Sequence, residues 1–321
     1  MWSRSGRQAR IWGRAGWIAL ALAAAPAFAA PAAGSGTFTS LAEAFDRFAT
    51  ESARQYAPDR VTRFGREVGP RLPDFYRPGA SGAAAFERRV TDALDGYPQI
   101  RERFLWAAAS IELRHRSAIA RFGRFFPGYR TTLPVYVIHS LGELDGGTRI
   151  IDGQVTLVFG ADVIARLHDE TTIGPLIDHE IFHGYHRPLF GECDAIWCGL
   201  WVEGLATYVA SRLNPGVGDR ALLLEFPQPI RPALEERADE AVCLTLARLD
   251  STAPEDLRGF FAGNGSMAGM PSRFGYFIGF RVAAQLGERR SLDALARLDR
   301  AAARREVEAV LRSMATCAES E

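Results

Sequence analysis

The sequence predicts an α+β protein that is mostly α-helical. Two observations predict this class. Helical spacing of apolar residues runs from Leu41 to Phe125 and resumes after Gly160 almost to the end of the chain. β-Branched residues concentrate between Leu133 and Phe159, which predicts a small sheet. With 321 residues, 47% of them hydrophobic and 24% charged, the chain can form one large or two modest globular domains.

The first 29 residues are expected to be a secretory signal peptide. No acidic residue lies among the four N-terminal arginines, which are Arg4, Arg7, Arg10 and Arg14. An apolar run over 17–25 follows, and the small-x-small triplet 27–29 precedes the expected cleavage after Ala29. The alternative is an uncleaved membrane anchor, although the apolar run is short for a transmembrane helix. We therefore expect a periplasmic or secreted protein.

The charge balance argues against a polyanionic partner. All 38 basic residues are arginine, and there are 38 acidic residues. Cleavage after residue 29 removes four arginines and leaves 34, so the formal net charge becomes −4. A mildly acidic mature chain has no pull toward nucleic acid or anionic membranes.

Four cysteines in an exported protein indicate disulfides. Cys193 and Cys198 are close enough in sequence to close a small loop, and Cys243 and Cys317 would then form a long-range bridge. We expect this pairing, although four cysteines allow three pairings. A cysteine zinc site is the alternative, for which C-x₄-C without a second close pair is weak support.

Residues 30–130 are expected to form a helical N-terminal region. Residues 30–37 are rich in Ala, Pro, Gly and Ser, which predicts a flexible start of the mature chain. Prolines between positions 70 and 78 divide the helical pattern of 41–125 into separate helices. This region has no catalytic pattern, so we expect it to cover the domain that follows.

Two segments predict the strands of the sheet. Leu133–Ile138 and Gln154–Phe159 are rich in β-branched residues. Asp152-Gly153 is expected to turn the chain into the second strand, and Gly146-Gly147 is expected to form an earlier turn. A short helix at Ala161–Leu167 is then expected to lead toward the segment that carries the chemistry.

That segment is His179-Glu180-Ile181-Phe182-His183. Residues four apart are neighbours on one face of a helix, so both imidazoles can reach one ion. Glu180 lies about 100° further around the helix and can lean over the metal without being a ligand. The H-E-x-x-H pattern of zinc hydrolases depends on this division of roles. The alternative is a surface helix with two unrelated histidines.

The neighbouring residues predict the helix that the motif needs. The spacing over 172–185 is compatible with a helix, Thr172 is available as its N-cap, and Pro188 is expected to stop it. The motif is therefore expected to lie on a helix of about four turns.

A catalytic zinc takes three protein ligands and keeps one position for water. Residues 184–202 separate His183 from the segment Trp201-Val-Glu-Gly-Leu-Ala-Thr-Tyr208. H-E-x-x-H followed at this interval by a helical glutamate resembles the gluzincin zinc metallopeptidases. The W-x-E-G-x-A-x-Y surroundings resemble the aminopeptidase branch and the uncharacterised bacterial zinc proteases related to it. The resemblance covers residues 170–212 most closely.

The resemblance implies that Glu203 is the third ligand of one zinc ion per chain. It also implies a thermolysin-like zincin core over 131–321, built from the small sheet, the active-site helix and the glutamate helix. Small residues beside Glu203 would let its helix lie close to the helix of His179. The alternative for Glu203 is an exposed helix acid.

The sequence also departs from the family's pattern. Val202 stands where the thermolysin-like branch has Asn, and Thr207 stands where that branch has Asp. Thr207 is expected to orient His179 more weakly from outside the ligand set. The Gly-x-Met-Glu-Asn motif of the aminopeptidases is absent from residues 148–160, so aminopeptidase specificity is not implied.

Hydrolysis needs further groups. Zinc lowers the pKa of its bound water, and Glu180 would pass the water's proton to the leaving nitrogen. The resemblance implies a Tyr or His donor to the oxyanion downstream of the ligand glutamate, and Tyr276 is our candidate. Its alternative is a buried helix tyrosine. Arg273 and Tyr208 are further candidates, although a solvated arginine and a core tyrosine are the more usual roles.

The helix of Tyr276 has its own signals. Ser272 is expected to cap this helix and Gly287 to end it. Gly275, Gly279 and Ala283 recur every four residues, which predicts close packing on another helix.

The resemblance further implies that an edge strand near the zinc pairs with extended substrate backbone, a role that we assign to Gln154–Phe159. His186 is expected to be a solvated histidine at the helix end, and the alternative is a place in the substrate groove. The metzincin pattern does not fit, because it needs a histidine where this chain has Leu189. The other histidines, at 115, 139 and 168, receive no role.

Together these observations predict an exported zinc metallopeptidase that acts on a peptide or protein. Two alternatives stay open. The first is a zinc hydrolase of a non-peptide substrate, because metal chemistry does not fix the substrate. The second is a non-catalytic, zinc-stabilised envelope protein, which would have no use for Glu180 and would normally supply four protein ligands.

Overall fold

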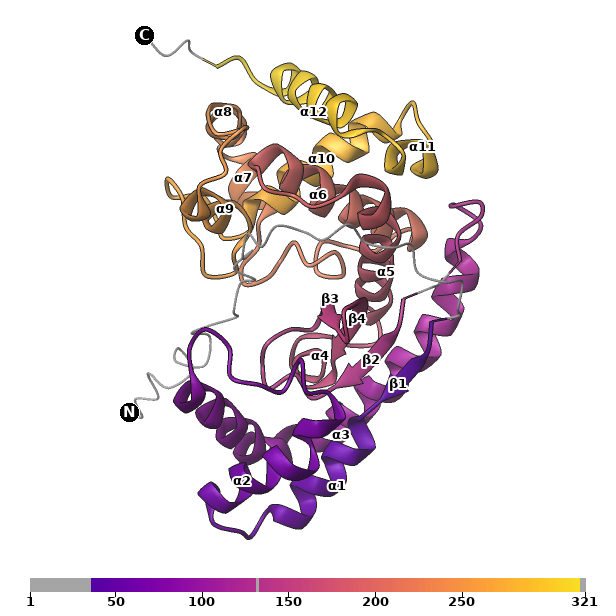
Figure 1. Ribbon diagram of the computed structural model, residues 1–321. Coiled ribbons are helices and arrows are strands. Elements are labelled where there is room, and N and C mark those ends of the chain that lie inside the picture. Colours follow the sequence, from indigo (N-terminus) through magenta and orange to yellow (C-terminus); the bar gives the residue numbers. More distant parts are fainter. Residues whose placement is uncertain (1–35, 131–132, 318–321) are drawn as a thin grey trace, which may run out of the picture.

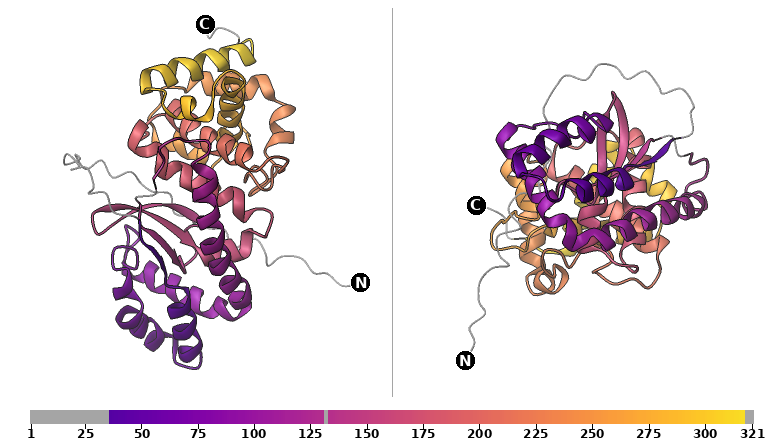
Figure 2. Two further views of the ribbon diagram at one scale, coloured as in Figure 1. Left: turned by 90° about the vertical axis from the view of Figure 1, so that its right-hand side faces the viewer. Right: turned by 90° about the horizontal axis from the view of Figure 1, so that it is seen from below.

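The computed structural model describes residues 36–130 and 133–317. Within these ranges the protein is α+β and mostly helical, as predicted, with a small sheet (Figure 1). The predicted signal peptide lies outside the described residues. Figures 1 and 2 place the N-terminal helices at one end of the molecule, the sheet in the middle and the C-terminal helices at the other end. No helix of the described ranges is long and apolar enough to cross a membrane.

The N-terminal region consists of α1 (Ala42–Ser52), α2 (Ala57–Glu67), a 3₁₀ turn at Gly69–Arg71 and the long helix α3 (Ala83–Phe122). Its prolines separate α2 from α3, as predicted. Helix α3 nevertheless continues through Pro98, and it packs against α1, α2, α4 and α5. Because α3 packs on α4 and α5, the N-terminal region is part of the packed core and not only a cover over the domain that follows.

Four strands form the sheet in the order β1-β2-β4-β3. They are β1 (Phe38–Ser40), β2 (Val135–Ile138), β3 (Gly146–Ile151) and β4 (Gln154–Gly160). The pairs β1–β2 and β2–β4 are parallel, whereas the pair β3–β4 is antiparallel. Sequence analysis did not predict β1, which brings the N-terminal region into the sheet.

Two predictions about the sheet are wrong. Gly146-Gly147 is not a turn, because both residues pair with β4 as the first part of β3. The segment Gln154–Phe159 is not the edge strand, because β4 lies between β2 and β3. The Asp152-Gly153 turn is confirmed. Both residues have positive φ, 49° and 73°, as the tight turn of a two-residue hairpin requires.

Three helices follow the sheet, namely α4 (Ala161–Leu167), α5 (Ile173–Phe190) and α6 (Ile196–Leu213). Helix α4 has the predicted bounds. Most residues of α5 and α6 are buried, so both are central helices of the core. Helix α5 packs on α3, α6, β3 and β4, which sets it between the sheet and the C-terminal helices.

The predicted ends of α5 are corrected. Thr172 occupies the N-cap position, but its hydroxyl accepts from the N–H of Asp169 and does not cap the helix. Pro188 does not stop the helix, which continues for two more residues, although Pro188 has no N–H to donate to the carbonyl four residues earlier. The helix ends at Phe190, before Gly191, whose φ is 87°.

Within the described residues, the C-terminal part consists of six helices. They are α7 (Arg231–Glu235), α8 (Ala238–Ala247), α9 (Pro254–Phe261), α10 (Phe274–Gly287), α11 (Leu292–Ala296) and α12 (Arg300–Met314). Of these, α9, α10, α11 and α12 pack on α6. Helix α10 makes the predicted close crossing, and its partner is α6. A Cβ atom on Gly204 would lie 2.1 Å from the carbonyl carbon of Gly279, so the two backbones touch.

Two details of this part bear on the predictions. Gly287 is the last residue of α10, as predicted. Ser272 does not cap α10, because its hydroxyl donates to the carbonyl of Gly265 and Arg273 occupies the position before the helix. The expected disulfides, Cys193–Cys198 and Cys243–Cys317, are both present.

Candidate metal centre

Helices α5 and α6 bring two imidazoles and one carboxylate together. The Nε2 atoms of His179 and His183 are 2.9 Å apart. Each of them lies 3.4 Å from Oε2 of Glu203. Among the described residues, these three form the group of side chains that could hold a metal ion. The structure thus joins the three ligands that the sequence predicted.

The spacing of the ligand atoms fits zinc. Ligand atoms at 2.0–2.1 Å from a tetrahedral ion are separated from one another by about 3.3 Å. The two distances from the imidazoles to Glu203 are close to that value, and the distance between the imidazoles is slightly shorter. Two nitrogen ligands and one carboxylate oxygen form a donor set of catalytic zinc sites and leave a fourth position for a small molecule.

The helical repeat and the packing of two helices explain this convergence. His179 and His183 are one turn apart on α5, and their rings lie edge to face with centroids 4.6 Å apart. Glu203 reaches them from α6, which packs along α5. His179 is buried, whereas His183 and Glu203 are partly exposed toward a cleft. The three side chains are therefore held by the core at its border with solvent.

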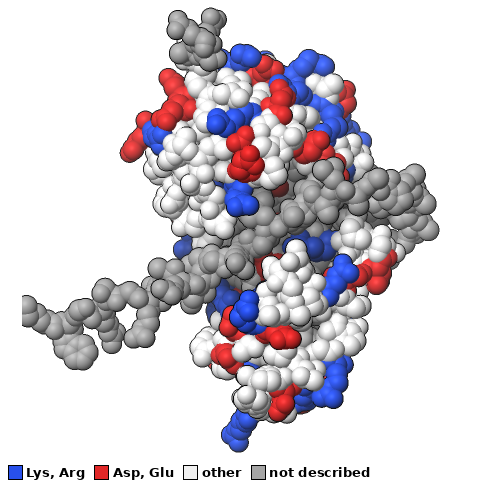
Figure 3. Space-filling view, turned by 60° about the vertical axis from the view of Figure 1, so that its left-hand side comes forward, with Lys and Arg blue, Asp and Glu red and all other residues white. Residues whose placement is uncertain are grey.

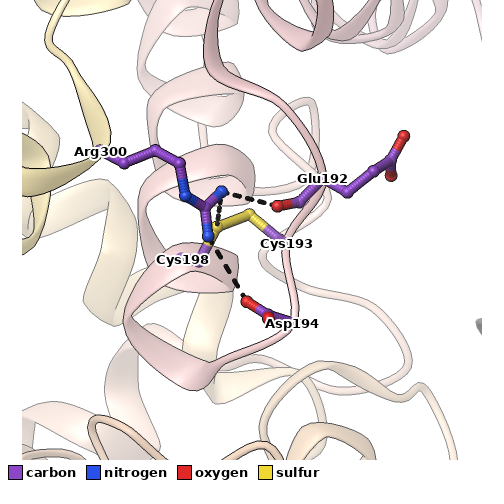
Figure 4. The surroundings of a disulfide bond; sticks show 5 residues. All are labelled: Glu192, Cys193, Asp194, Cys198 and Arg300. Carbon is purple, nitrogen blue, oxygen red and sulfur yellow. Dashed lines mark hydrogen bonds and ion pairs between the residues drawn. A yellow bond between two sulfur atoms is a disulfide. The ribbon is translucent and has the colours of Figure 1, made fainter. Parts of the chain in front are cut away.

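A short cross-linked segment joins the two ligand helices. Cys193 lies between the helices and Cys198 on the first turns of α6, with Cα atoms 5.3 Å apart (Figure 4). Arg300 of α12 lies over this segment. Its Nη1 donates to the carbonyl of Glu192 at 2.6 Å and to Sγ of Cys198 at 3.5 Å, and its Nη2 lies 3.4 Å from the carboxylate of Asp194.

The same guanidinium stacks on two rings. Its carbon lies 5.4 Å from the ring centre of Phe190 and 5.2 Å from that of Trp197. Phe190 ends α5, and Trp197 belongs to the first turn of α6. Arg300 therefore ties the end of α5 to the start of α6, and no pattern in the sequence indicated this role.

Glu180 lies beside the three ligands without belonging to their set. It is buried against β3, where a Cβ atom on Gly146 would lie only 2.6 Å from Cγ of Glu180. Burial, against the opposing charge of His183 and with smaller contributions from the carboxylates of Asp145 and Glu203, raises the pKa of Glu180 to about 7. A carboxyl group of that pKa can both take and return a proton near neutral pH.

The positive charge of His183 and the negative charge of Glu203 stabilise each other. Burial disfavours a charged His183, but Glu203 and Glu180 outweigh it and raise the pKa of His183 to about 9. Burial raises the pKa of Glu203, but the charge of His183 and the hydrogen bonds from both imidazoles hold it well below its usual range. Burial lowers the pKa of His179.

A cleft of about 680 Å³ opens beside His179, His183 and Glu203, which are called the metal residues below. The first residues of β3 and residues of α5 line it. Tyr276 and Arg273 from the start of α10 also line it, with Phe226 from an earlier loop. The edge strand that faces the metal residues is therefore β3, in place of the predicted β4.

The other predicted residues have the following surroundings. Tyr276 lines the cleft, and burial together with the charge of Glu203 raises its pKa. Thr207 is buried and its hydroxyl donates to the carbonyl of Glu203 at 2.8 Å, so its action on His179 stays a prediction. Tyr208 is buried and accepts a hydrogen bond from Arg212, which places it in the core.

The expectation of a solvated His186 is wrong. This ring is 1% exposed and lies stacked between Phe182 and Phe190, with centroids 5.0 and 4.9 Å away. Within the described residues its two ring nitrogens have no hydrogen-bond partner. Its position four residues from both phenylalanines was visible in the sequence, but the helix was expected to end too early to bury it.

Sequence analysis missed the contribution of Asp145. Its carboxylate lines the cleft, accepts the N–H of Gly146 at 2.9 Å and lies 3.3 Å from Nε2 of His168. The buried carboxylate of Asp162 fixes the loop before it by accepting the N–H groups of Ser140 and Gly142. A rigid loop thus delivers the start of β3 to Glu180.

The outer surface carries both signs of charge. On the face shown in Figure 3, arginines and acidic residues are interspersed, and no large region has a single sign. Many of these charges form ion pairs, such as Arg304 with Asp250 at 2.7 Å.

Comparison of the chain with protein-family models, with curated proteins and with solved structures finds no match in any of the three. Inferences about function consequently rest on the geometry of the metal centre and its cleft.

Proposed function

We propose that the protein is an exported zinc-dependent peptidase with a thermolysin-like catalytic core. One observation carries the proposal. His179, His183 and Glu203 converge with the spacing of zinc ligands, next to a cleft and beside a buried carboxylate that is not a ligand. A purely structural zinc site would normally supply a fourth protein ligand and would need no such carboxylate.

In this proposal His179, His183 and Glu203 hold the metal. Zinc supplies a Lewis acid that polarises a carbonyl and makes water a better nucleophile at neutral pH. Glu180 takes the proton of the attacking water and returns it to the leaving nitrogen. Its burial favours the first step, because burial raises the pKa of the carboxyl group and makes the carboxylate a stronger base.

Tyr276 is the proposed donor to the oxygen that becomes negatively charged. It lines the cleft within reach of the charges of Glu203 and Glu180, and its raised pKa keeps the phenol protonated. A neutral phenol can donate a hydrogen bond to an oxyanion, whereas a phenolate cannot.

The edge of β3 is the proposed site for the substrate's main chain. Within the described residues β3 pairs with a strand only on its β4 side, and residues Gly146–Arg149 line the cleft. An extended peptide could add there as a further strand. A substrate-analogue complex without main-chain hydrogen bonds to β3 would rule out this mode of binding.

Export is proposed from the leader pattern of residues 1–29 and from the two disulfides. Disulfides persist in oxidising compartments, which fits a periplasmic or secreted protein.

The decisive experiment combines metal analysis with peptide cleavage. The mature protein is expected to bind one zinc per chain and to cleave peptides from a mixed library. Glu180→Gln is expected to keep the zinc and to lose cleavage by a factor of about 100 or more, because general base catalysis contributes on this scale. Bound zinc without cleavage of any peptide would favour the non-catalytic alternative, and cleavage of esters alone would favour the non-peptide hydrolase.

The role of Glu203 has its own test. Glu203→Ala removes one of three ligands and should weaken zinc binding by at least a factor of about 10. Glu192→Ala is a matched control, because this acid also lines the cleft but pairs with Arg187 and not with the metal histidines. Full zinc affinity of Glu203→Ala would remove Glu203 from the ligand set.

A further inference from the structure

The cleft contains a cation without a matching anion. Two of its arginines are paired: Arg149 donates to Glu143 at 3.1 Å, and Arg187 donates to Glu192 at 2.7 Å. Arg273 differs, because no carboxylate of the described residues lies within ion-pair distance of it. A charge that the fold holds in a cleft without a counter-ion is available to a ligand.

Backbone contacts fix the position of this guanidinium. Nη1 of Arg273 donates to the carbonyls of Leu223 and Phe226, both at 3.3 Å. The guanidinium also lies over the ring of Tyr276, with its carbon 4.2 Å from the ring centre. The two carbonyls engage Nη1, and the side chain also shares a hydrogen bond with Tyr276. Arginine has five N–H groups, so two of them remain for a ligand. Arginine's planar fork suits an anionic oxygen.

Its location is beside the metal residues. Arg273 lines the cleft together with Tyr276, Glu180 and the start of β3. Burial raises the pKa of Asp145, but His168, the N–H of Gly146 and the charge of Arg273 together lower it, so the charge of Arg273 acts on the loop before β3. The residue is also in the left-handed backbone conformation, with φ of 63°, which is uncommon for a residue of this size. The fourth cleft arginine, Arg166, is mostly exposed and has its guanidinium near α3.

We propose that Arg273 is the residue that binds an anionic oxygen of the bound peptide. This oxygen is either the free C-terminal carboxylate of the peptide or the oxygen that gains negative charge at the scissile carbonyl. The inference rests on the proposed peptidase function and deepens it, because the first source would make the enzyme selective for chain ends and the second would make Arg273 a catalytic residue.

The test uses one cleavable peptide in two forms, with a free C-terminal carboxylate and with a C-terminal amide. Binding of both forms is measured by calorimetry on the zinc-loaded Glu180→Gln protein, and kcat is measured on the wild type. Arg273→Gln removes the charge, and Arg273→Lys keeps it. Arg281→Gln is the matched control, because Arg281 lies two turns further along α10, outside the cleft.

A carboxylate partner predicts that Arg273→Gln weakens binding of the free acid by about tenfold or more and leaves binding of the amide unchanged. An oxyanion partner predicts equal binding of both forms and a fall in kcat by a factor of about 100, with partial recovery in Arg273→Lys. The proposal is overturned if binding and kcat of Arg273→Gln stay within twofold of the Arg281→Gln control.

Further measurements distinguish a loss of folding from a loss of ligand binding. Thermal unfolding shows whether Arg273→Gln has loosened the loop that its guanidinium contacts. If that variant does not fold, equal binding of acid and amide by the Glu180→Gln protein, together with a kcat of the uncharged Arg273→Met within twofold of Arg281→Gln, overturns the proposal. A zinc-loaded wild type that cleaves no peptide would instead refute the proposed function itself.

Discussion

A Cβ atom on Gly146 would lie 2.6 Å from Cγ of Glu180. The edge strand β3 and the proposed general base can therefore approach each other this closely only because residue 146 has no side chain. Gly146 is not in a left-handed conformation, so space alone demands a glycine here. The contact also buries Glu180, and burial is the main cause of its raised pKa.

We expect Gly146→Ala to impair catalysis without removing the metal. The new methyl group would push Glu180 away from the metal residues, and a displacement of about 1 Å can cost a factor of about 100 in rate. Zinc affinity should stay unchanged, because no metal ligand contacts this position. Gly65→Ala is the control, since a Cβ atom there has nothing within 4 Å. Unchanged kcat/KM of Gly146→Ala would show that Glu180 does not need this position.

Zinc binding should depend steeply on pH. In the metal-free protein His183 has a pKa of about 9, so at pH 7 it holds a proton that zinc must displace. Affinity should rise by up to about tenfold per pH unit between pH 6 and pH 8, and level off as pH passes the pKa of His183. Competition with a chelator measures the dissociation constant, and calorimetry in two buffers measures the protons released. A dissociation constant that is independent of pH would contradict this assignment.

The ligand set could be predicted from the sequence because its chemistry is local. His179 and His183 need only a helix to meet, and the interval to Glu203 suggested the third ligand. The buried pattern of α5 and α6 and the Asp152-Gly153 turn are likewise determined by short-range rules.

The features that could not be predicted from the sequence depend on packing between residues that are far apart in the chain. Gly146-Gly147 was predicted as a turn because glycine pairs usually mark turns, but here the glycine admits Glu180 against a strand. β1 is three residues long and has no pattern of its own before it meets β2. Arg273 and Arg300 act through backbone carbonyls and rings that lie far away in sequence. Rules about the spacing of residues along the chain cannot identify partners that are this far apart in sequence.

His186→Phe should stabilise the protein, although it changes a buried residue. The ring of His186 is stacked between two phenylalanines with both nitrogens unpaired within the described residues, and an unsatisfied buried polar group costs about 1–3 kcal/mol. A phenyl ring keeps the stack and removes this cost, less a packing penalty for its larger size. Urea unfolding at pH 7 should show a gain of about 1 kcal/mol.

The same variant should lose part of the acid sensitivity. Burial lowers the pKa of His186 to about 3, whereas the unfolded chain takes up this proton near pH 6.5. Wild-type stability is therefore present above pH 6.5 and falls as pH drops from 6.5 toward 3, by up to about 1.4 kcal/mol per unit. The difference in unfolding free energy between His186→Phe and wild type should widen over that interval. A constant difference would mean that His186 is not buried neutral.

Gly204→Ala should damage both stability and the metal site. The added methyl group would overlap the backbone of Gly279, which cannot move aside as a flexible side chain could. Overpacking of this kind costs about 1–3 kcal/mol or more. Glu203 precedes the affected residue on α6, so separation of α6 from α10 should also weaken zinc binding. Gly65→Ala again serves as the control, and equal melting temperatures of the two variants would contradict the close crossing.

The two disulfides should have separable effects. The bridge Cys243–Cys317 spans 74 residues and Cys193–Cys198 spans 5, so loop entropy assigns them about 4.5 and about 2 kcal/mol of stability. Replacing both cysteines of the long bridge by serine should lower the free energy of unfolding more, and leave the zinc affinity of the folded protein unchanged. Replacing the short bridge should lower stability less but weaken zinc binding, because it frees the segment that joins the helices of His183 and Glu203. Urea unfolding and chelator competition on the two double variants measure both effects, and equal zinc affinities would show that Arg300 alone fixes that segment.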